Sequence, residues 1–115
     1  MPHVDLTYLK ELAGGNEEFL NDMIQKFVQK TPDELAELQT HLKDKNWTRL
    51  RAIAHKMRQA LSFMGIKELE DIVASIEDFA KDEKNLDQLP ELVESTVRIT
   101  NESLEELKET QSSST

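Results

Sequence analysis

Apolar residues recur every three or four positions along almost the whole chain, and this spacing constrains the fold more than any other feature. An α-helix turns once every 3.6 residues, so this spacing lines apolar side chains along one helix face. No segment carries the pattern of a β-strand. Only three glycines and three prolines interrupt the chain. The sequence therefore predicts an all-α protein.

Capping residues and glycines divide this pattern into separate helices. The first predicted helix covers residues 5–13, with Asp5 as its cap and two glycines after its end. The others are predicted to begin at Asn16, at about Asn46, near Lys67 and at Asp87. Amphipathic helices joined by short connections pack side by side in alternating directions. We therefore predict an antiparallel four-helix bundle with a short extra N-terminal helix.

The stretch from residue 16 to residue 43 contains Pro32, which permits two interpretations. Thr31 and Glu34 have the spacing of a capping box, and proline suits the first turn of a new helix. The apolar positions nevertheless keep one register across the proline. We expect either one long kinked helix or two nearly collinear helices.

Length and composition limit the class of protein. A chain of 115 residues suits one domain, which we place at residues 1–110, followed by a disordered polar tail at residues 111–115. No cysteine, membrane-length apolar run or signal-peptide pattern is present, so we expect a cytoplasmic protein that does not contact a membrane. The net charge of −9 argues against nucleic-acid binding. No exposed apolar seam demands a dimer, and we expect a monomer.

His55 is the residue whose surroundings suggest chemistry. The buried stripe of its helix is predicted to be Trp47, Leu50, Ala54, Met57, Leu61 and Met64. His55 lies on another face, with Arg51 and Arg58 about one turn away and Lys56 beside it. Residues 47–67 include five basic residues and no acidic one, although the chain has 23 acidic residues. A local excess of positive charge suits a group that carries or meets a phosphate.

An exposed histidine without a function would leave the same pattern, and spacing alone does not decide between the two interpretations. A metal site is not expected, because His3, His41 and His55 show no paired ligand spacing. The sequence also has no glycine-rich loop for a nucleotide and no nucleophilic serine motif.

The segment from residue 54 to residue 65 resembles the signature of histidine-containing phosphotransfer (HPt) domains, the four-helix-bundle carriers of bacterial phosphorelays. The matching residues are Ala54, His55, Met57, Arg58 and Gly65. Residues 5–9, 14–20 and 46–47 also resemble the usual layout of the family.

Two positions depart from the family pattern. Arg58 stands where lysine is commoner, which keeps the charge and changes its geometry. Gln59 stands where the family has a glycine that leaves room for the partner's backbone.

The resemblance implies a carrier function. His55 would be the nucleophile that accepts a phosphoryl group from a receiver-domain aspartate and returns it. Arg58, Arg51, Lys56, Gln59 and Gly65 would stabilise the phosphate or dock the partner. No cofactor is expected on this chain, since Mg²⁺ would belong to the receiver domain, and no autokinase activity is expected. Response-regulator receiver domains are the implied partners, with a hybrid sensor histidine kinase as a further candidate.

Glu77 is predicted to orient the His55 ring. In an antiparallel bundle the middle of helix 67–81 lies level with the middle of the histidine helix, and Glu77 borders its buried stripe. A carboxylate there would accept the Nδ1 proton and leave Nε2 free to react. The alternative is that Glu77 is one more solvated acid.

Two other functions remain open from the sequence. One is a non-catalytic HPt-like binding module that docks receiver domains, and the replacement of the family glycine by Gln59 is the feature that would indicate it. The other is an acidic structural bundle without a role in phosphotransfer.

Overall fold

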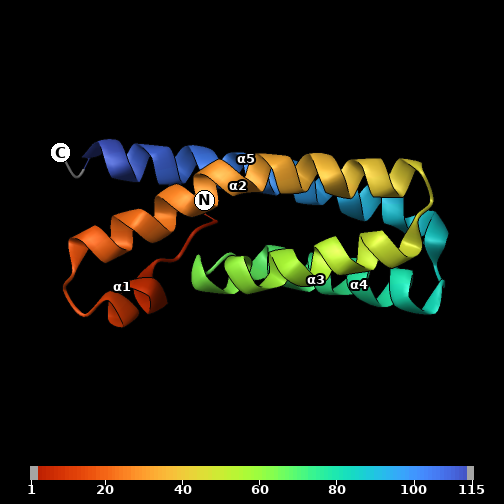
Figure 1. The fold of residues 1–115 in the computed structure, drawn as a ribbon, viewed down its shortest axis with the longest axis horizontal. Helices are drawn as coiled ribbons and strands as arrows, with labels where there is room; N and C mark the ends of the chain where they lie inside the picture. The colour runs from red at the N-terminus through yellow and green to blue at the C-terminus, as the bar shows by residue number, and fades with distance from the viewer. Residues whose placement is uncertain (1–2, 114–115) are drawn as a thin grey trace.

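Two pairs of antiparallel helices form the body of the protein, as the computed structural model of residues 3–113 shows (Figure 1). The elements are α1 (Thr7–Ala13), α2 (Glu17–Lys43), α3 (Trp47–Phe63), α4 (Lys67–Asp82), the 3-10 turn η1 (Leu86–Gln88) and α5 (Leu89–Ser113). Helix α2 packs against α5, and α3 packs against α4. No strand occurs within residues 3–113. The predicted all-α bundle with a short N-terminal helix is confirmed.

Pro32 lies inside α2 and does not end it, so the single long helix is the correct one of the two predicted alternatives. The helix is bent along its length (Figure 1). The predicted capping box at Thr31 is wrong, because Thr31 has a helical neighbour on each side and its side chain faces the core. Its hydroxyl has no hydrogen-bond partner among residues 3–113.

Asparagine caps set the start of α2 and α3, as predicted. The side chain of Asn16 accepts the Phe19 backbone N–H at 3.0 Å, and that of Asn46 accepts the Arg49 N–H at 3.2 Å. The first helix begins later than predicted, at Thr7, whose N–H donates to the Asp5 carboxylate at 3.0 Å. Hydrogen bonds from Thr7 lower the pKa of that carboxyl group.

The core is built from the apolar faces of the four long helices. In α3 the buried residues are Leu50, Ile53, Ala54, Met57 and Leu61. Trp47, which was predicted to belong to the buried stripe, is only partly buried. In α5 the buried face contains polar side chains as well as apolar ones. It includes Thr96, Thr100 and Ser103, and two of these hydroxyls donate to carbonyls one turn back.

The C-terminal helix is longer than the sequence predicts. Helix α5 continues through Ser113, so the backbone of residues 111–113 is helical where a disordered tail was expected. Residues 114–115, the rest of that predicted tail, lie outside the described residues, as do residues 1–2. None of the helices between residues 3 and 113 is long and apolar enough to cross a membrane.

Gly65 joins the α3–α4 hairpin to the N-terminal segment. Its φ is +64°, and a Cβ atom at this position would lie 2.1 Å from the backbone carbonyl oxygen of Asp5. The Asp5 N–H donates to the carbonyl of Met64 at 3.1 Å, which holds the two backbones together. Only glycine combines this left-handed conformation with so close an approach.

Gly65→Ala is expected to lower the free energy of unfolding by about 2 kcal/mol, since it adds a backbone clash to the cost of a left-handed alanine. Gly14→Ala is the matched control, because Gly14 has φ +55° and a Cβ atom added there would have no neighbouring atom within 4 Å. It should cost about 1 kcal/mol. Chemical denaturation measures both values, and equal losses would show that the contact with Asp5 contributes nothing.

Candidate functional site

His55 lies in the middle of α3, and its ring faces Glu77 on α4. Nδ1 of His55 is 2.5 Å from Oε1 of Glu77, and the other carboxylate oxygen accepts a hydrogen bond of 2.7 Å from Nη1 of Arg58. The His55 side chain is 65% exposed, whereas that of Glu77 is 10% exposed. One nitrogen of an open imidazole is therefore anchored to a buried carboxylate.

The charge of Glu77 fixes how the ring is protonated. Burial raises the pKa of Glu77, but hydrogen bonds from Arg58 and His55, and their positive charge, outweigh it and bring the pKa below its usual range. An ionised carboxylate can only accept hydrogen bonds, so the proton lies on Nδ1 of His55. The lone pair of a neutral ring is then on Nε2, which is the nucleophilic atom.

The short α3–α4 connection determines this contact. It makes the two helices antiparallel neighbours. Nearer the turn, the hydroxyl of Ser62 on α3 donates a hydrogen bond to Glu70 on α4, which fits the same alignment of the two helices. Glu77 then lies level with His55, as the sequence predicts. Glu77 is not one more solvated acid.

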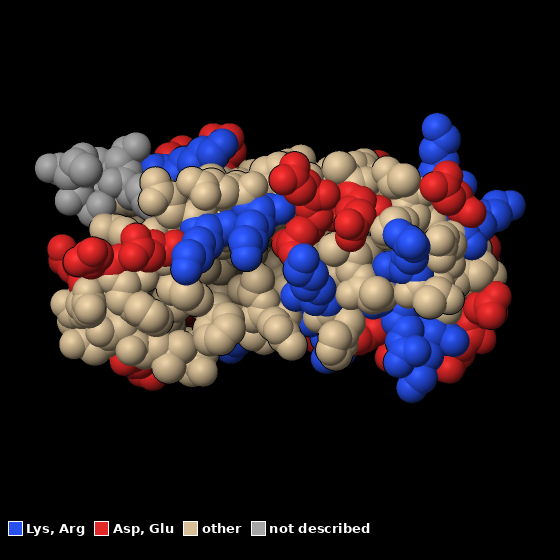
Figure 2. Space-filling view, in the orientation of Figure 1, with Lys and Arg blue, Asp and Glu red and all other residues tan. Residues whose placement is uncertain are grey.

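Acids from other helices reach part of the basic segment on α3. Nζ of Lys56 is 3.9 Å from Oε2 of Glu34 on α2, and Arg58 is paired with Glu77 on α4. Burial raises the pKa of Glu34, against the positive charge of Lys56 and Lys30. Figure 2 shows this mixture, with Lys and Arg side chains over α2 and α3 interrupted by acids. The segment is therefore less positive than its sequence suggests.

Gly65 lies far from the imidazole. Helix α3 ends at Phe63, eight residues or about 12 Å beyond His55, and Gly65 lies in the turn that follows. Its close contact with Asp5 gives it a packing role, so the structure does not bring it together with the phosphate-handling candidates.

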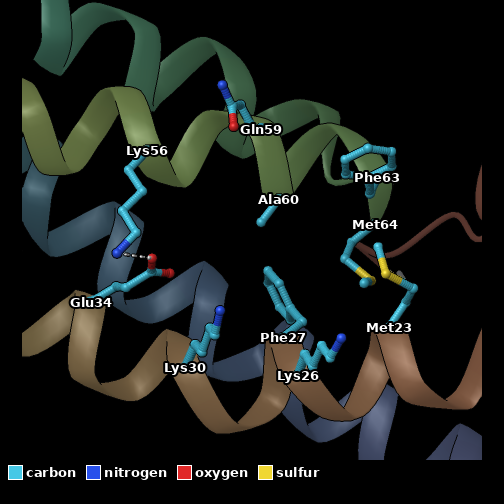
Figure 3. A pocket seen from close by; sticks show the side chains of 10 residues that line it. All are labelled: Met23, Lys26, Phe27, Lys30, Glu34, Lys56, Gln59, Ala60, Phe63 and Met64. Carbon is cyan, nitrogen blue, oxygen red and sulfur yellow. Dashed lines mark ion pairs between the residues drawn. The ribbon is translucent and has the colours of Figure 1, made fainter.

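Gln59 is exposed and lies at the edge of a groove between α2 and α3 (Figure 3). The groove has an apolar floor and a rim that carries three lysines. Its lining consists of Met23, Lys26, Phe27, Lys30, Glu34, Lys56, Gln59, Ala60, Phe63 and Met64. Sequence reasoning missed this groove, because its two walls come from different helices.

An exposed apolar area adjoins the groove. The ring of Tyr8 on α1 stacks on Phe63 with their centroids 6.0 Å apart. Tyr8, Leu12 and Phe19 are the large apolar side chains that stay exposed within residues 3–113. Phe63 lines the groove, so the ring of Tyr8 extends the apolar area at that end of the groove.

The other two histidines contact carboxylates. The ring of His3 lies 3.4 Å from Glu68 and 3.2 Å from Glu102, and its backbone N–H donates to Glu106 at 2.9 Å. His41 lies 3.8 Å from Glu37. Within residues 3–113 no group of three or more His, Cys, Asp or Glu side chains is arranged to hold a metal ion.

Comparisons with known proteins identify the family and agree with the fold. Residues 22–110 match the family model of the Hpt domain. The crystal structure of histidine-containing phosphotransfer protein B (HptB) from Pseudomonas aeruginosa PAO1 has the same fold, with a TM-score of 0.87, 24% sequence identity and 96% of each chain covered. No curated protein sequence matches the chain. Because the family match covers most of the chain, this protein belongs to the Hpt domain family of histidine phosphotransfer proteins.

Proposed function

We propose that this protein carries a phosphoryl group on His55 between the aspartates of response-regulator receiver domains. The observation that carries the proposal is the contact of 2.5 Å between His55 and Glu77, which anchors one nitrogen of an exposed imidazole and frees the other.

The reaction exchanges one bond to phosphorus for another. Nε2 of His55 attacks the phosphorus of an aspartyl phosphate, the N–P bond forms, and the aspartate carboxylate leaves. The ring then carries a positive charge, which the ionised carboxylate of Glu77 stabilises through Nδ1. Return of the group to an aspartate reverses these steps. The receiver domain supplies Mg²⁺, and this chain contributes no cofactor and no autokinase activity.

The groove between α2 and α3 supports the docking of a receiver domain. Its floor is apolar, and Lys26, Lys30 and Lys56 surround it with positive charge that suits a partner with an acidic active site. The partners on this proposal are receiver domains and a hybrid sensor kinase, but not nucleic acid or membrane. The protein would act as a monomer in the cytoplasm.

Incubation with a phosphorylated receiver domain tests the proposal. We expect the protein to acquire phosphate that maps to His55. This phosphate should be acid-labile, as is usual for a phosphohistidine. Absence of label from a panel of receiver domains that nevertheless bind the protein would favour the non-catalytic docking module.

The alternative of a non-catalytic docking module rests on Gln59. This residue lines the docking groove, and the family has a glycine at its position. Gln59→Gly is expected to open the groove, widen the range of receivers accepted and cost about 1 kcal/mol of helix stability. Transfer rates with several receivers measure the effect. Arg49→Gly in the first turn of α3 is the control for the loss of helix stability. Identical partner rates for the wild-type protein and Gln59→Gly would show that the glutamine is tolerated without a role.

A further inference from the structure

A second hollow lies on the other side of His55, between α3 and α4. His55 itself lines it, together with Trp47 and Arg51 from α3, Lys81 from α4 and Glu83 at the end of α4. The register seen in the contact between His55 and Glu77 explains this arrangement. Arg51 is one turn before His55, and Lys81 is one turn after Glu77 on the antiparallel helix.

The two cations of this hollow form no ion pair within residues 3–113, unlike Lys56 and Arg58 on α3. No carboxylate within residues 3–113 forms an ion pair with Arg51 or Lys81, whereas Arg58 and Lys56 each contact a glutamate. The positive charge available to an anion at His55 therefore comes first from Arg51 and Lys81. Arg58 would have to leave Glu77 to do the same.

We propose that this hollow is a phosphate-binding subsite, in which Arg51 and Lys81 hold the oxygens of the phosphoryl group carried on His55. The assignment to the carried group rests on the proposed function. Guanidinium and ammonium groups are the side chains that bind phosphate oxygens most strongly in proteins. Glu83 opposes the binding of an anion, and its carboxylate limits the affinity of the subsite.

Trp47 provides a direct readout of the subsite. It is the only tryptophan in the chain, and it lines the hollow, so its fluorescence reports an ion bound there. Titration of the unphosphorylated protein with inorganic phosphate, at ionic strength held constant with chloride, is expected to give a saturable change. This measurement needs no phosphotransfer, so it remains informative if His55 is never labelled.

Substitutions in both directions test which groups bind the ion. Arg51→Gln and Lys81→Gln should each weaken phosphate binding by about fivefold, the upper range for an exposed ion pair. Glu83→Gln should tighten it. Lys10→Gln removes an exposed lysine of α1 that lines neither the hollow nor the groove, and it should leave the affinity unchanged. A phosphate response that is absent, or that is equal in all four variants, overturns the subsite.

Phosphorylation of His55 supplies the second arm of the test. A phosphoryl group on His55 would occupy the hollow and engage its two cations. The phosphorylated protein should therefore bind free phosphate at least fivefold more weakly, which is about the effect expected from losing one cation. An unchanged affinity would overturn the assignment of the subsite to the carried group. Labelling of His55 without any phosphate response would leave the proposed function standing and remove the subsite.

Discussion

Replacing His55 with glutamine is expected to reduce phosphorylation of the protein to background and to leave its folding unchanged. Glutamine can still donate an N–H to Glu77, but its amide has no nucleophilic nitrogen to attack phosphorus. Because the His55 side chain is largely exposed, the free energy of unfolding should change by no more than about 0.5 kcal/mol. Transfer of labelled phosphate from a receiver domain and chemical denaturation measure the two effects.

His41→Gln is the matched control for this experiment. His41 is on α2, where it contacts Glu37 instead of a buried carboxylate, and its replacement should leave the label intact. Label retained in His55→Gln would place the phosphate elsewhere and refute the proposed role of His55.

Glu77→Gln is expected to slow phosphotransfer by between about tenfold and a hundredfold, the range found when a carboxylate that orients a metal-binding histidine is removed. The substitution keeps the shape of the side chain and removes the charge that fixes the proton on Nδ1. Nitrogen NMR of the ring distinguishes this positioning role from a purely structural one, because the variant should contain a mixture of His55 tautomers. Asp78→Asn, at an exposed acid beside Glu77, is the control. An unchanged transfer rate with an unchanged tautomer would refute the role of Glu77.

The pH dependence of stability gives an independent measure of Glu77. Its pKa is lowered in the folded protein, so its contribution to stability is complete above the ordinary glutamate value of 4.5. That contribution is lost as the pH falls through the lowered pKa. Glu77→Gln should therefore show a weaker loss of stability between about pH 5 and about pH 3 than the wild-type protein does. Parallel stability curves would show that the carboxylate is not held in its charged form by folding.

The sequence by itself determined the helices and the face on which each side chain lies. The spacing of apolar residues and caps such as Asn16 and Asn46 act within one or two turns, so they can be read without knowledge of the fold. The exposure of His55 follows from the same periodicity. Its contact with Glu77 could be predicted because a short connection between antiparallel helices fixes which residues lie level.

Apart from the contact between His55 and Glu77, only the tertiary structure decided which groups from different helices meet. The partner of Lys56 is Glu34, which lies on α2, and the hollow beside His55 gains Lys81 from α4. Periodicity gives the direction of a side chain from its own helix axis, but the rotation and bend of the neighbouring helices depend on how the whole core packs. The bend of α2 and the burial of Thr31 were set in the same way. The helices of this protein are therefore a local property of its sequence, whereas its charge pairs, groove and hollow are properties of the packed bundle.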